Sequence, residues 1–260
     1  MEWAEGEPSS VLRGRVRAFT GYREQLDRPV RRRETPAAEL TLIISFGDGF
    51  WAQASPNDDA LRPFTSFVAG IADRPIRTAH DGRQLGIQVR LDPQGAFALL
   101  GVPLHELGNR VVELSELLGR DGERWADQLA QISDWPERFA MLDSLLGTRM
   151  AAGPSPSPQV AWAWRAMRRS RGAVRIADLA GAAGCSHRHL IAGFREQIGA
   201  TPKTAAQVLR YQRAAQLLSR GDLTPATVAT MCGYADQSHL TRVFTRFAGT
   251  TPAALRQQAT

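Results

Sequence analysis

The stretch Gly233–Phe244, which reads GYADQSHLTRVF, decides the fold of the C-terminal part of this 260-residue chain. Its first residue is a glycine, which readily adopts the left-handed backbone conformation that ends a helix. Asp236 is placed to cap a second helix. Leu240 and Phe244 lie four residues apart and therefore share one face of that helix. The stretch predicts a tight turn followed by an amphipathic helix that begins at Asp236.

The same pattern occurs once earlier in the chain. The matching positions are Leu179-Ala180, Gly184, His189-Leu190, Phe194, Gly199 and Thr201-Pro202 in the first copy, and Val228-Ala229, Gly233, His239-Leu240, Phe244, Gly249 and Thr251-Pro252 in the second. Each copy predicts a helix-turn-helix, with a short apolar helix over 176–183 or 225–232 and a second helix after the turn. Between the copies, residues 203–219 are typical of a long helix that Gly221 ends.

The outward faces of the two second helices carry groups that suit DNA. In the major groove, Arg and Gln side chains can form paired hydrogen bonds with base edges. We therefore expect double-stranded DNA as the partner. The candidate DNA-binding residues are Ser186, His187, Arg188, Ile191, Ala192 and Arg195 in the first copy, and Gln237, Ser238, Thr241, Arg242 and Arg246 in the second.

The pattern from Arg175 to Arg256, and above all the stretch GYADQSHLTRVF, resembles the AraC/XylS family of bacterial transcription regulators. The resemblance implies two helix-turn-helix subdomains whose recognition helices enter successive major-groove segments roughly 34 Å apart. Two positions after the leucine of the His-Leu pair, the family usually carries a basic residue. The second copy has Arg242 there, whereas the first has Ala192. We expect the second helix to read bases directly and the first to depend more on shape, methyl contacts and phosphates.

Charge is divided unevenly along the chain, which carries a net charge of +6. Residues 154–260 hold 14 Arg and Lys against 4 Asp and Glu, whereas residues 1–153 hold 18 against 22. This division suggests that the basic half meets a polyanion, although a solvated basic surface would have the same composition.

The remaining bulk features predict a cytoplasmic protein without membrane contact. No stretch approaches the roughly 18 uninterrupted apolar residues of a membrane span. The acidic start of the chain lacks the basic-then-apolar pattern of a secretory signal. The two cysteines, Cys185 and Cys232, form no disulfide framework.

The chain divides at residues 151–158, which read AAGPSPSP. Three alternating prolines favour an extended spacer between a domain over 1–150 and a DNA-binding domain over 159–260. Before the spacer, the patterns at 12–19, 39–46, 64–71 and 84–91 predict strands, and Gly47-Asp48-Gly49 predicts a turn. Residues from Pro93 onward, and a segment capped by Asp134, predict helices. The fold class is α+β overall: a β-rich barrel or sandwich with closing helices, then an all-α domain of two helix-turn-helix units joined by a long helix.

The resemblance implies that the N-terminal domain binds a small effector, mediates dimerisation, or does both. We expect a regulator controlled by a small molecule, with a homodimer and RNA polymerase as further candidate partners. The helices near 111–118 and 139–146 are candidates for a dimer surface. The aromatic residues Phe46, Trp51, Phe64 and Phe67 could line a cavity or form an ordinary β core. The alternative is a ligand-independent regulator controlled by a protein partner or by abundance, and a third reading fuses an enzyme or sugar-binding module to a DNA anchor.

No catalytic grouping is evident in the sequence. We find no nucleophile elbow, phosphate-binding glycine loop or paired-carboxylate motif, so we expect no enzyme activity and no cofactor. The cluster Cys185-Ser186-His187-Arg188-His189 lacks the convergent fourth ligand of a zinc site, so no metal is expected. One of Trp162 and Trp164 is expected in the core, with the neighbouring arginines at phosphates or solvent. The run Arg31-Arg32-Arg33 is expected in a solvated turn, although it could also contact DNA or a partner.

Overall fold

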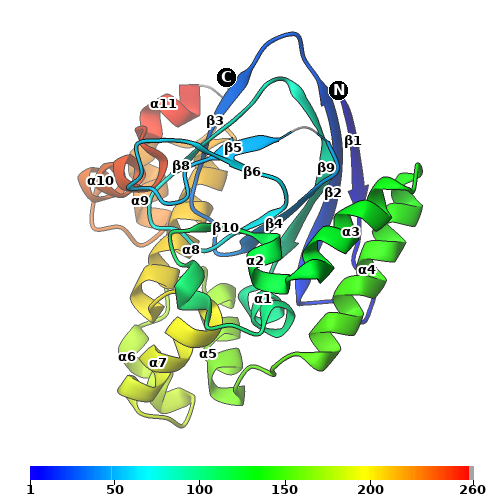
Figure 1. The fold of residues 1–260 in the computed structure, drawn as a ribbon. Coiled ribbons are helices and arrows are strands. Elements are labelled where there is room, and N and C mark those ends of the chain that lie inside the picture. The colour runs from blue at the N-terminus through cyan, green and yellow to red at the C-terminus, as the bar shows by residue number, and fades with distance from the viewer. Residues whose placement is uncertain (48, 258–260) are drawn as a thin grey trace.

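The computed structural model describes residues 1–47 and 49–257, and its N-terminal half contains two antiparallel sheets that face each other (Figure 1). The six-stranded sheet has the order β1 (Glu2–Gly6), β2 (Val16–Gln25), β9 (Arg83–Leu91), β4 (Leu40–Ser45), β7 (Phe67–Ala69), β10 (Val111–Glu113). The four-stranded sheet has the order β3 (Val30–Glu34), β8 (Ile76–His80), β5 (Phe50–Ala52), β6 (Arg62–Phe64). The predicted β-rich half is confirmed as two sheets, and within the described residues they do not close into a barrel.

Strands form where apolar residues alternate. In β4, Leu40, Leu42 and Ile44 lie on one face and are almost completely buried, as the period of two requires. The strands predicted at 39–46 and 84–91 are confirmed as β4 and β9. The predicted turn at 47–49 includes Asp48, which lies outside the described residues.

Three sequence-based expectations in this half need correction. The strand predicted over 12–19 begins only at Val16, because residues 12–15 form a turn in which the Arg15 amide donates to the Leu12 carbonyl at 2.9 Å. The strand predicted over 64–71 is divided into the last residue of β6, Phe64, and the whole of β7. The run Arg31-Arg32-Arg33 lies in β3 and pairs with β8, with Arg32 opposite Thr78.

Helices close the N-terminal half: α1 (Pro93–Leu100), the 3-10 helix η1 (Leu104–Leu107), α2 (Leu114–Leu118), α3 (Arg120–Ala130) and α4 (Trp135–Ala152). Asp134 caps α4 as predicted, accepting a hydrogen bond from the Glu137 amide at 3.3 Å. The apolar face of α4 packs on the sheet, with Phe139 stacked on Phe19 at a ring distance of 5.9 Å. Phe139, Leu142 and Leu146 are buried inside the chain, so these side chains are not available as a dimer surface.

The C-terminal half is entirely helical within the described residues. Helix α4 includes Ala151 and Ala152, so the extended stretch before α5 covers only residues 153–157. The helices that follow are α5 (Pro158–Arg169), α6 (Ile176–Ala182), α7 (His187–Ile198), α8 (Pro202–Leu218), α9 (Pro225–Met231), α10 (Gln237–Ala248) and α11 (Pro252–Gln257). In the part of the chain that the structure describes, no helix has the length and apolar character needed to cross a membrane.

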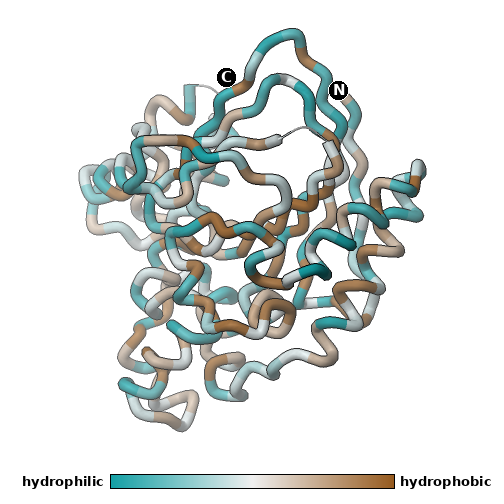
Figure 2. Tube along the Cα trace, viewed as in Figure 1, coloured by the Kyte–Doolittle hydropathy of each residue, from teal (hydrophilic) through white to brown (hydrophobic). Residues whose placement is uncertain are grey.

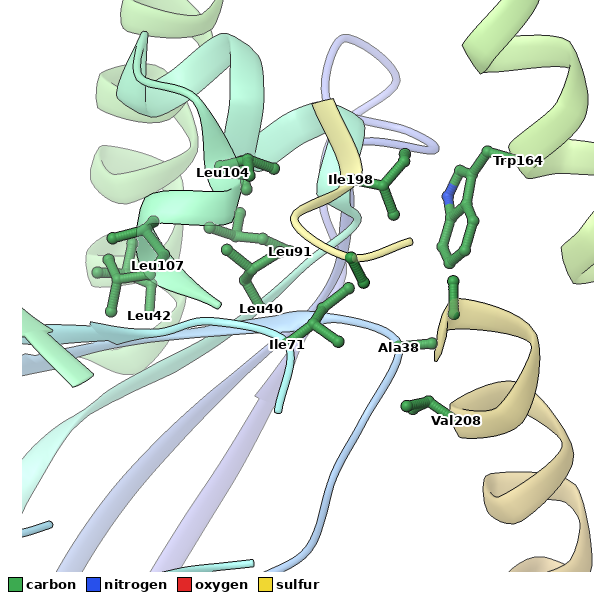
Figure 3. Close-up of a cluster of buried hydrophobic side chains, with 14 of the residues drawn as sticks. Ala38, Leu40, Leu42, Ile71, Leu91, Leu104, Leu107, Trp164, Ile198 and Val208 are labelled. Carbon is green, nitrogen blue, oxygen red and sulfur yellow. The ribbon is translucent and has the colours of Figure 1, made fainter. Parts of the chain in front are cut away.

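The two halves share one apolar core. Leu40 and Leu91 of the sheet, with Leu104 of η1, meet Trp164 of α5 and Ile198 of α7 in one cluster of buried side chains (Figure 3). The hydropathy view shows hydrophobic residues gathered in the strands and in the helices next to them (Figure 2). Burial of apolar area at this junction therefore holds the first helix-turn-helix unit against the N-terminal half.

Candidate nucleic-acid interface and N-terminal cavity

Two helix-turn-helix units are present, and their turns are built as the repeat predicts. Gly184 and Gly233 have left-handed φ angles of 69° and 70°, which end α6 and α9 and redirect the chain. The Ser186 hydroxyl then accepts a hydrogen bond from the His189 amide at 3.2 Å, and Asp236 accepts one from the His239 amide at 2.6 Å. These side chains satisfy free amides at the starts of α7 and α10 and so fix where each recognition helix begins.

The buried face of each recognition helix is fully used for packing. Leu190 and Phe194 in α7, and Leu240 and Phe244 in α10, have no exposed surface. Helix α8 joins the units, and its Tyr211 ring lies edge-on to Phe244 at 5.0 Å. The two units lie at the two ends of α8 (Figure 1).

The structure leaves most of the candidate DNA-binding residues exposed. In the first unit, the half-buried exception is Ile191; the exposed residues are Ser186, His187, Arg188, Ala192 and Arg195. In the second unit, the half-buried exception is Thr241, whose hydroxyl donates to the Gln237 carbonyl at 2.9 Å; the exposed residues are Gln237, Ser238, Arg242 and Arg246. Contact of these groups with DNA stays a prediction.

Among these arginines, Arg246 differs from the others. Its guanidinium forms an ion pair and hydrogen bond with Asp73, which follows β7 in the N-terminal half. Within residues 1–47 and 49–257, Arg188, Arg195 and Arg242 form no ion pair. Arg246 is therefore engaged by the N-terminal half, whereas the other three guanidinium groups are available to phosphates or bases.

A buried carboxylate between the two halves was not identified from the sequence. Asp92 accepts hydrogen bonds from Arg17 at 2.6 Å, from Arg168 at 2.7 Å and from the Trp164 indole nitrogen at 3.2 Å. Burial raises the pKa of Asp92 to about 6, although the nearby guanidinium group of Arg17 opposes this shift. Of the two tryptophans of α5, Trp164 is the buried one and Trp162 is half-buried. Arg168 binds Asp92 rather than meeting solvent or phosphate alone.

A cavity of about 210 Å³ lies between the two sheets of the N-terminal half. Its apolar side includes Ile43, Phe50, Phe67 and Val111, and its polar side includes Glu24, Arg32, Glu34, Thr78, Gln84 and Gln88. Of the four aromatic residues considered from the sequence, Phe67 lines the cavity. Phe64 is buried and packs against Phe67 at a ring distance of 5.7 Å, Phe46 lies under the Arg138 guanidinium at 5.2 Å, and Trp51 is 38% exposed. The polar lining comes from several strands, and the alternation of residues within each strand does not predict that these strands lie around one cavity.

One short segment connects this cavity to the DNA-binding half. Thr35, Pro36 and Ala37 line the cavity and also line a groove against α8. Immediately after them, the Ala38 amide donates to the Gln212 side chain of α8 at 3.0 Å. Immediately before them, Arg33 donates to the Gly249 carbonyl at the end of α10 at 3.0 Å. The segment 33–38 therefore touches both the cavity and the second helix-turn-helix unit.

Two family models match separate parts of the chain. Residues 179–258 match a family described as a helix-turn-helix domain, and residues 4–113 match a domain of unknown function, DUF6597. The HTH-type transcriptional activator RhaR of Cronobacter sakazakii is 38% identical over 79 residues, which is 28% of this chain and 28% of that protein. RhaR of Escherichia coli is 36% identical over 74 residues, covering 28% of this chain and 26% of that protein. The chain thus spans less than a third of the length of these curated relatives.

Comparison with solved structures extends the similarity of fold to the N-terminal half. ToxT of Vibrio cholerae, bound to (E)-4-(8-methylnaphthalen-1-yl)but-3-enoic acid, has a TM-score of 0.54 and 9% identity, covering 93% of this chain and 99% of that chain. A second ToxT structure has a TM-score of 0.51 at 9% identity. This similarity concerns the fold alone. With its two capped recognition helices, the C-terminal part of the chain matches the helix-turn-helix family model and is similar to the corresponding part of these HTH-type transcriptional activators.

Proposed function

We propose that this protein is a cytoplasmic transcription activator that binds DNA through both helix-turn-helix units and is controlled by a small molecule in the N-terminal cavity. The observation that carries this proposal is the segment 33–38, which forms part of the cavity wall and contacts α8 and α10. A ligand changes a conformational equilibrium only if it contacts the two states differently. A ligand against Thr35–Ala37 meets this requirement, because movement of that wall changes the hydrogen bonds of Arg33 and Ala38 to the second unit and to α8.

The ToxT structure supports control by a ligand because it holds a bound organic acid, and the RhaR relatives support activation because they are transcriptional activators. An activator also contacts RNA polymerase, so we include that partner in the proposal. The homodimer stays a prediction, which sedimentation of the purified chain would check. The cavity favours ligand control over a regulator without a ligand, since such a regulator would be expected to have a filled core between its sheets.

DNA binding is tested by sequencing the genomic fragments that the purified full chain retains. Arg242→Ala should reduce enrichment of a common sequence motif, because it removes from α10 an exposed arginine that forms no ion pair within the described residues. Arg28→Ala serves as the matched control, because it removes an exposed arginine from the loop between β2 and β3. Equal enrichment by the wild-type chain and the Arg242→Ala variant would overturn the proposal.

Ligand control is tested separately, by a thermal-shift screen of metabolites followed by gel shifts of the recovered DNA with and without each stabilising compound. In Gln212→Ala, which removes the side chain bonded to Ala38, the compound should still stabilise the protein but no longer change DNA affinity. Gln207→Ala, which also lies on α8 but does not line the groove, is the matched control and should respond as wild type. A ligand effect that persists fully in Gln212→Ala contradicts the proposed route.

A further inference from the structure

The lining of the N-terminal cavity carries more negative than positive charge. Its ionisable acids are Glu24, Glu34 and Glu39, whereas its one cationic side chain in the described residues is Arg32. Arg32 already binds Glu24 at 2.6 Å. His80, which approaches the other Glu24 oxygen at 3.1 Å, adds no dependable charge, since burial lowers its pKa. The negative charges of the other two carboxylates, Glu34 and Glu39, are therefore not neutralised by a cation of the cavity lining.

These two carboxylates differ in how they are balanced. Glu39 faces Arg17 at 4.0 Å and Arg90 at 3.8 Å, so cations outside the cavity partly neutralise it. Glu34 accepts a hydrogen bond from the Thr78 hydroxyl at 3.3 Å and, within the described residues, has no cationic partner within 4 Å. Glu34 is exposed, which places this carboxylate at the opening of the cavity. An incoming cation would gain an ion pair there, whereas an anion would meet repulsion.

The strand register explains why polar groups gather in this cavity. Glu34 is opposite Ile76 and Arg32 is opposite Thr78, so the pairs share the inner face of the smaller sheet. On the larger sheet, Glu24 lies opposite Gln84. Gln84 is 8% exposed and lines the cavity, so a ligand or water there can bond its side-chain amide.

The other side of the cavity suits an apolar body. The Phe50 and Phe67 rings lie 5.2 Å apart, next to Ile43 and Val111. At the opposite side, the Trp3 and Tyr22 rings lie 6.0 Å apart, and Trp3 is 51% exposed. Aromatic faces attract organic cations as well as apolar groups. The volume of about 210 Å³ is below the roughly 300–1,000 Å³ of pockets for drug-sized ligands, so the ligand is small.

We infer that the cavity takes a small organic cation, such as a primary amine on an aromatic or branched apolar body, with its charge at Glu34. This inference rests on the proposed function and adds the chemical class of the ligand. It also distinguishes this chain from ToxT, whose bound compound is named as a carboxylic acid.

The test is calorimetry of the full chain with three probes that share one body: phenethylamine, phenethyl alcohol and hydrocinnamate. Phenethylamine should bind, and hydrocinnamate should bind at least roughly tenfold more weakly, because a charged hydrogen bond is replaced by repulsion. Glu34→Gln should weaken phenethylamine by roughly tenfold while leaving phenethyl alcohol unchanged. Glu116→Gln removes an exposed carboxylate from α2 and is the matched control.

Each other outcome decides against the inference. Equal or tighter binding of phenethyl alcohol or hydrocinnamate would show that the cavity binds small molecules, as the proposed function requires, but not that it selects cations. Binding of phenethylamine that Glu34→Gln does not weaken would place the charge elsewhere. Failure of all three probes to bind would also overturn the inference. The proposed function would then still be tested independently, by the metabolite screen and the gel shifts that follow it.

Discussion

The first helix-turn-helix unit rests on the N-terminal half through apolar side chains, whereas the second unit touches it through polar groups. Ile198 at the end of α7 is completely buried with Leu104 and Trp164. The contact is close, because a Cβ added to Gly199, whose φ is +87°, would lie 3.0 Å from the Leu104 carbonyl oxygen. In the second unit, the equivalent Gly249 offers its carbonyl to the exposed Arg33.

This difference separates a fixed unit from a releasable one. Apolar burial is worth about 25 cal/mol per Å² and does not depend on charge screening. An exposed ion pair such as Asp73–Arg246 is worth roughly 0–1 kcal/mol and weakens as salt rises. Near-identical sequence motifs are therefore held by different contacts. Under the proposed function, the second unit, which carries Arg242, is the one whose position a ligand would change at low cost.

The largest expected effect is on the apolar junction. Trp164→Ala should lower the free energy of unfolding by about 3–5 kcal/mol, because it removes a side chain that is 1% exposed and is hydrogen-bonded to Asp92. Urea unfolding followed by circular dichroism measures this loss. Trp162→Ala, at a half-buried position of the same helix, is the control and should cost less. If Trp164→Ala lowered the free energy of unfolding no more than Trp162→Ala does, burial of apolar side chains would not be what stabilises the junction.

The second expected effect concerns how the two units read DNA. Arg242→Ala should weaken binding to the preferred sequence by about 1–3 kcal/mol and reduce discrimination between sequences, because it removes a group able to bond base edges. Arg188→Ala in the first unit should weaken binding to all sequences more evenly. Gel-shift titrations on preferred and scrambled DNA give both values. Greater loss of discrimination in Arg188→Ala would reverse the predicted roles.

A pH effect is expected at the first unit. Because burial raises the pKa of Asp92 from 3.8 to about 6, the folded protein retains a proton that the unfolded chain has released between these values. The contribution of Asp92 to stability is therefore complete at about pH 4 and is lost as the pH rises to about 6. The difference in unfolding free energy between wild type and Asp92→Asn should fall over this range and remain level above it. A difference that grows with pH would mean that the arginines lower this pKa.

The smallest expected effect is at the second unit. Asp73→Asn should change the free energy of unfolding by less than about 1 kcal/mol, because the ion pair that it breaks is exposed. Release of Arg246 should raise DNA affinity by roughly two- to fivefold at low salt, and the gain should fade as salt is added. Asp58→Asn, another N-terminal carboxylate substitution, is the control. Unchanged or reduced DNA affinity of Asp73→Asn would show that Arg246 does not contribute to DNA binding.

The helix-turn-helix units could be predicted because their signals are local. Caps at Ser186 and Asp236, left-handed glycines and an apolar period of 3.6 all act within a few residues. The strands with clear alternation, β4 and β9, were predictable for the same reason. The boundary between β6 and β7 was not, since two adjacent short strands in different sheets look like one apolar run.

The contacts between the halves could not be predicted, because they join residues far apart in the chain. Asp92 has the local signature of a helix cap, and nothing near it indicates Arg168 as its partner. The run Arg31-Arg32-Arg33 resembles a solvated turn, but strand pairing directs Arg32 to Glu24 and leaves Arg33 beside α10. The cavity likewise depends on how the strands of two sheets are paired, and the residue pattern of a single strand does not reveal its pairing.

The difference in docking is tested most directly by distances between spin labels in a chain with Cys185→Ser and Cys232→Ala. One label pair joins Glu116→Cys on α2 to Arg188→Cys on α7, and the other joins Glu116→Cys to Thr245→Cys on α10; all three positions are exposed. Raising the salt concentration should broaden the distance distribution to α10 and leave the distribution to α7 unchanged. Equal broadening of both, or broadening at α7 alone, would contradict the distinction between an apolar, fixed first unit and a polar, releasable second unit.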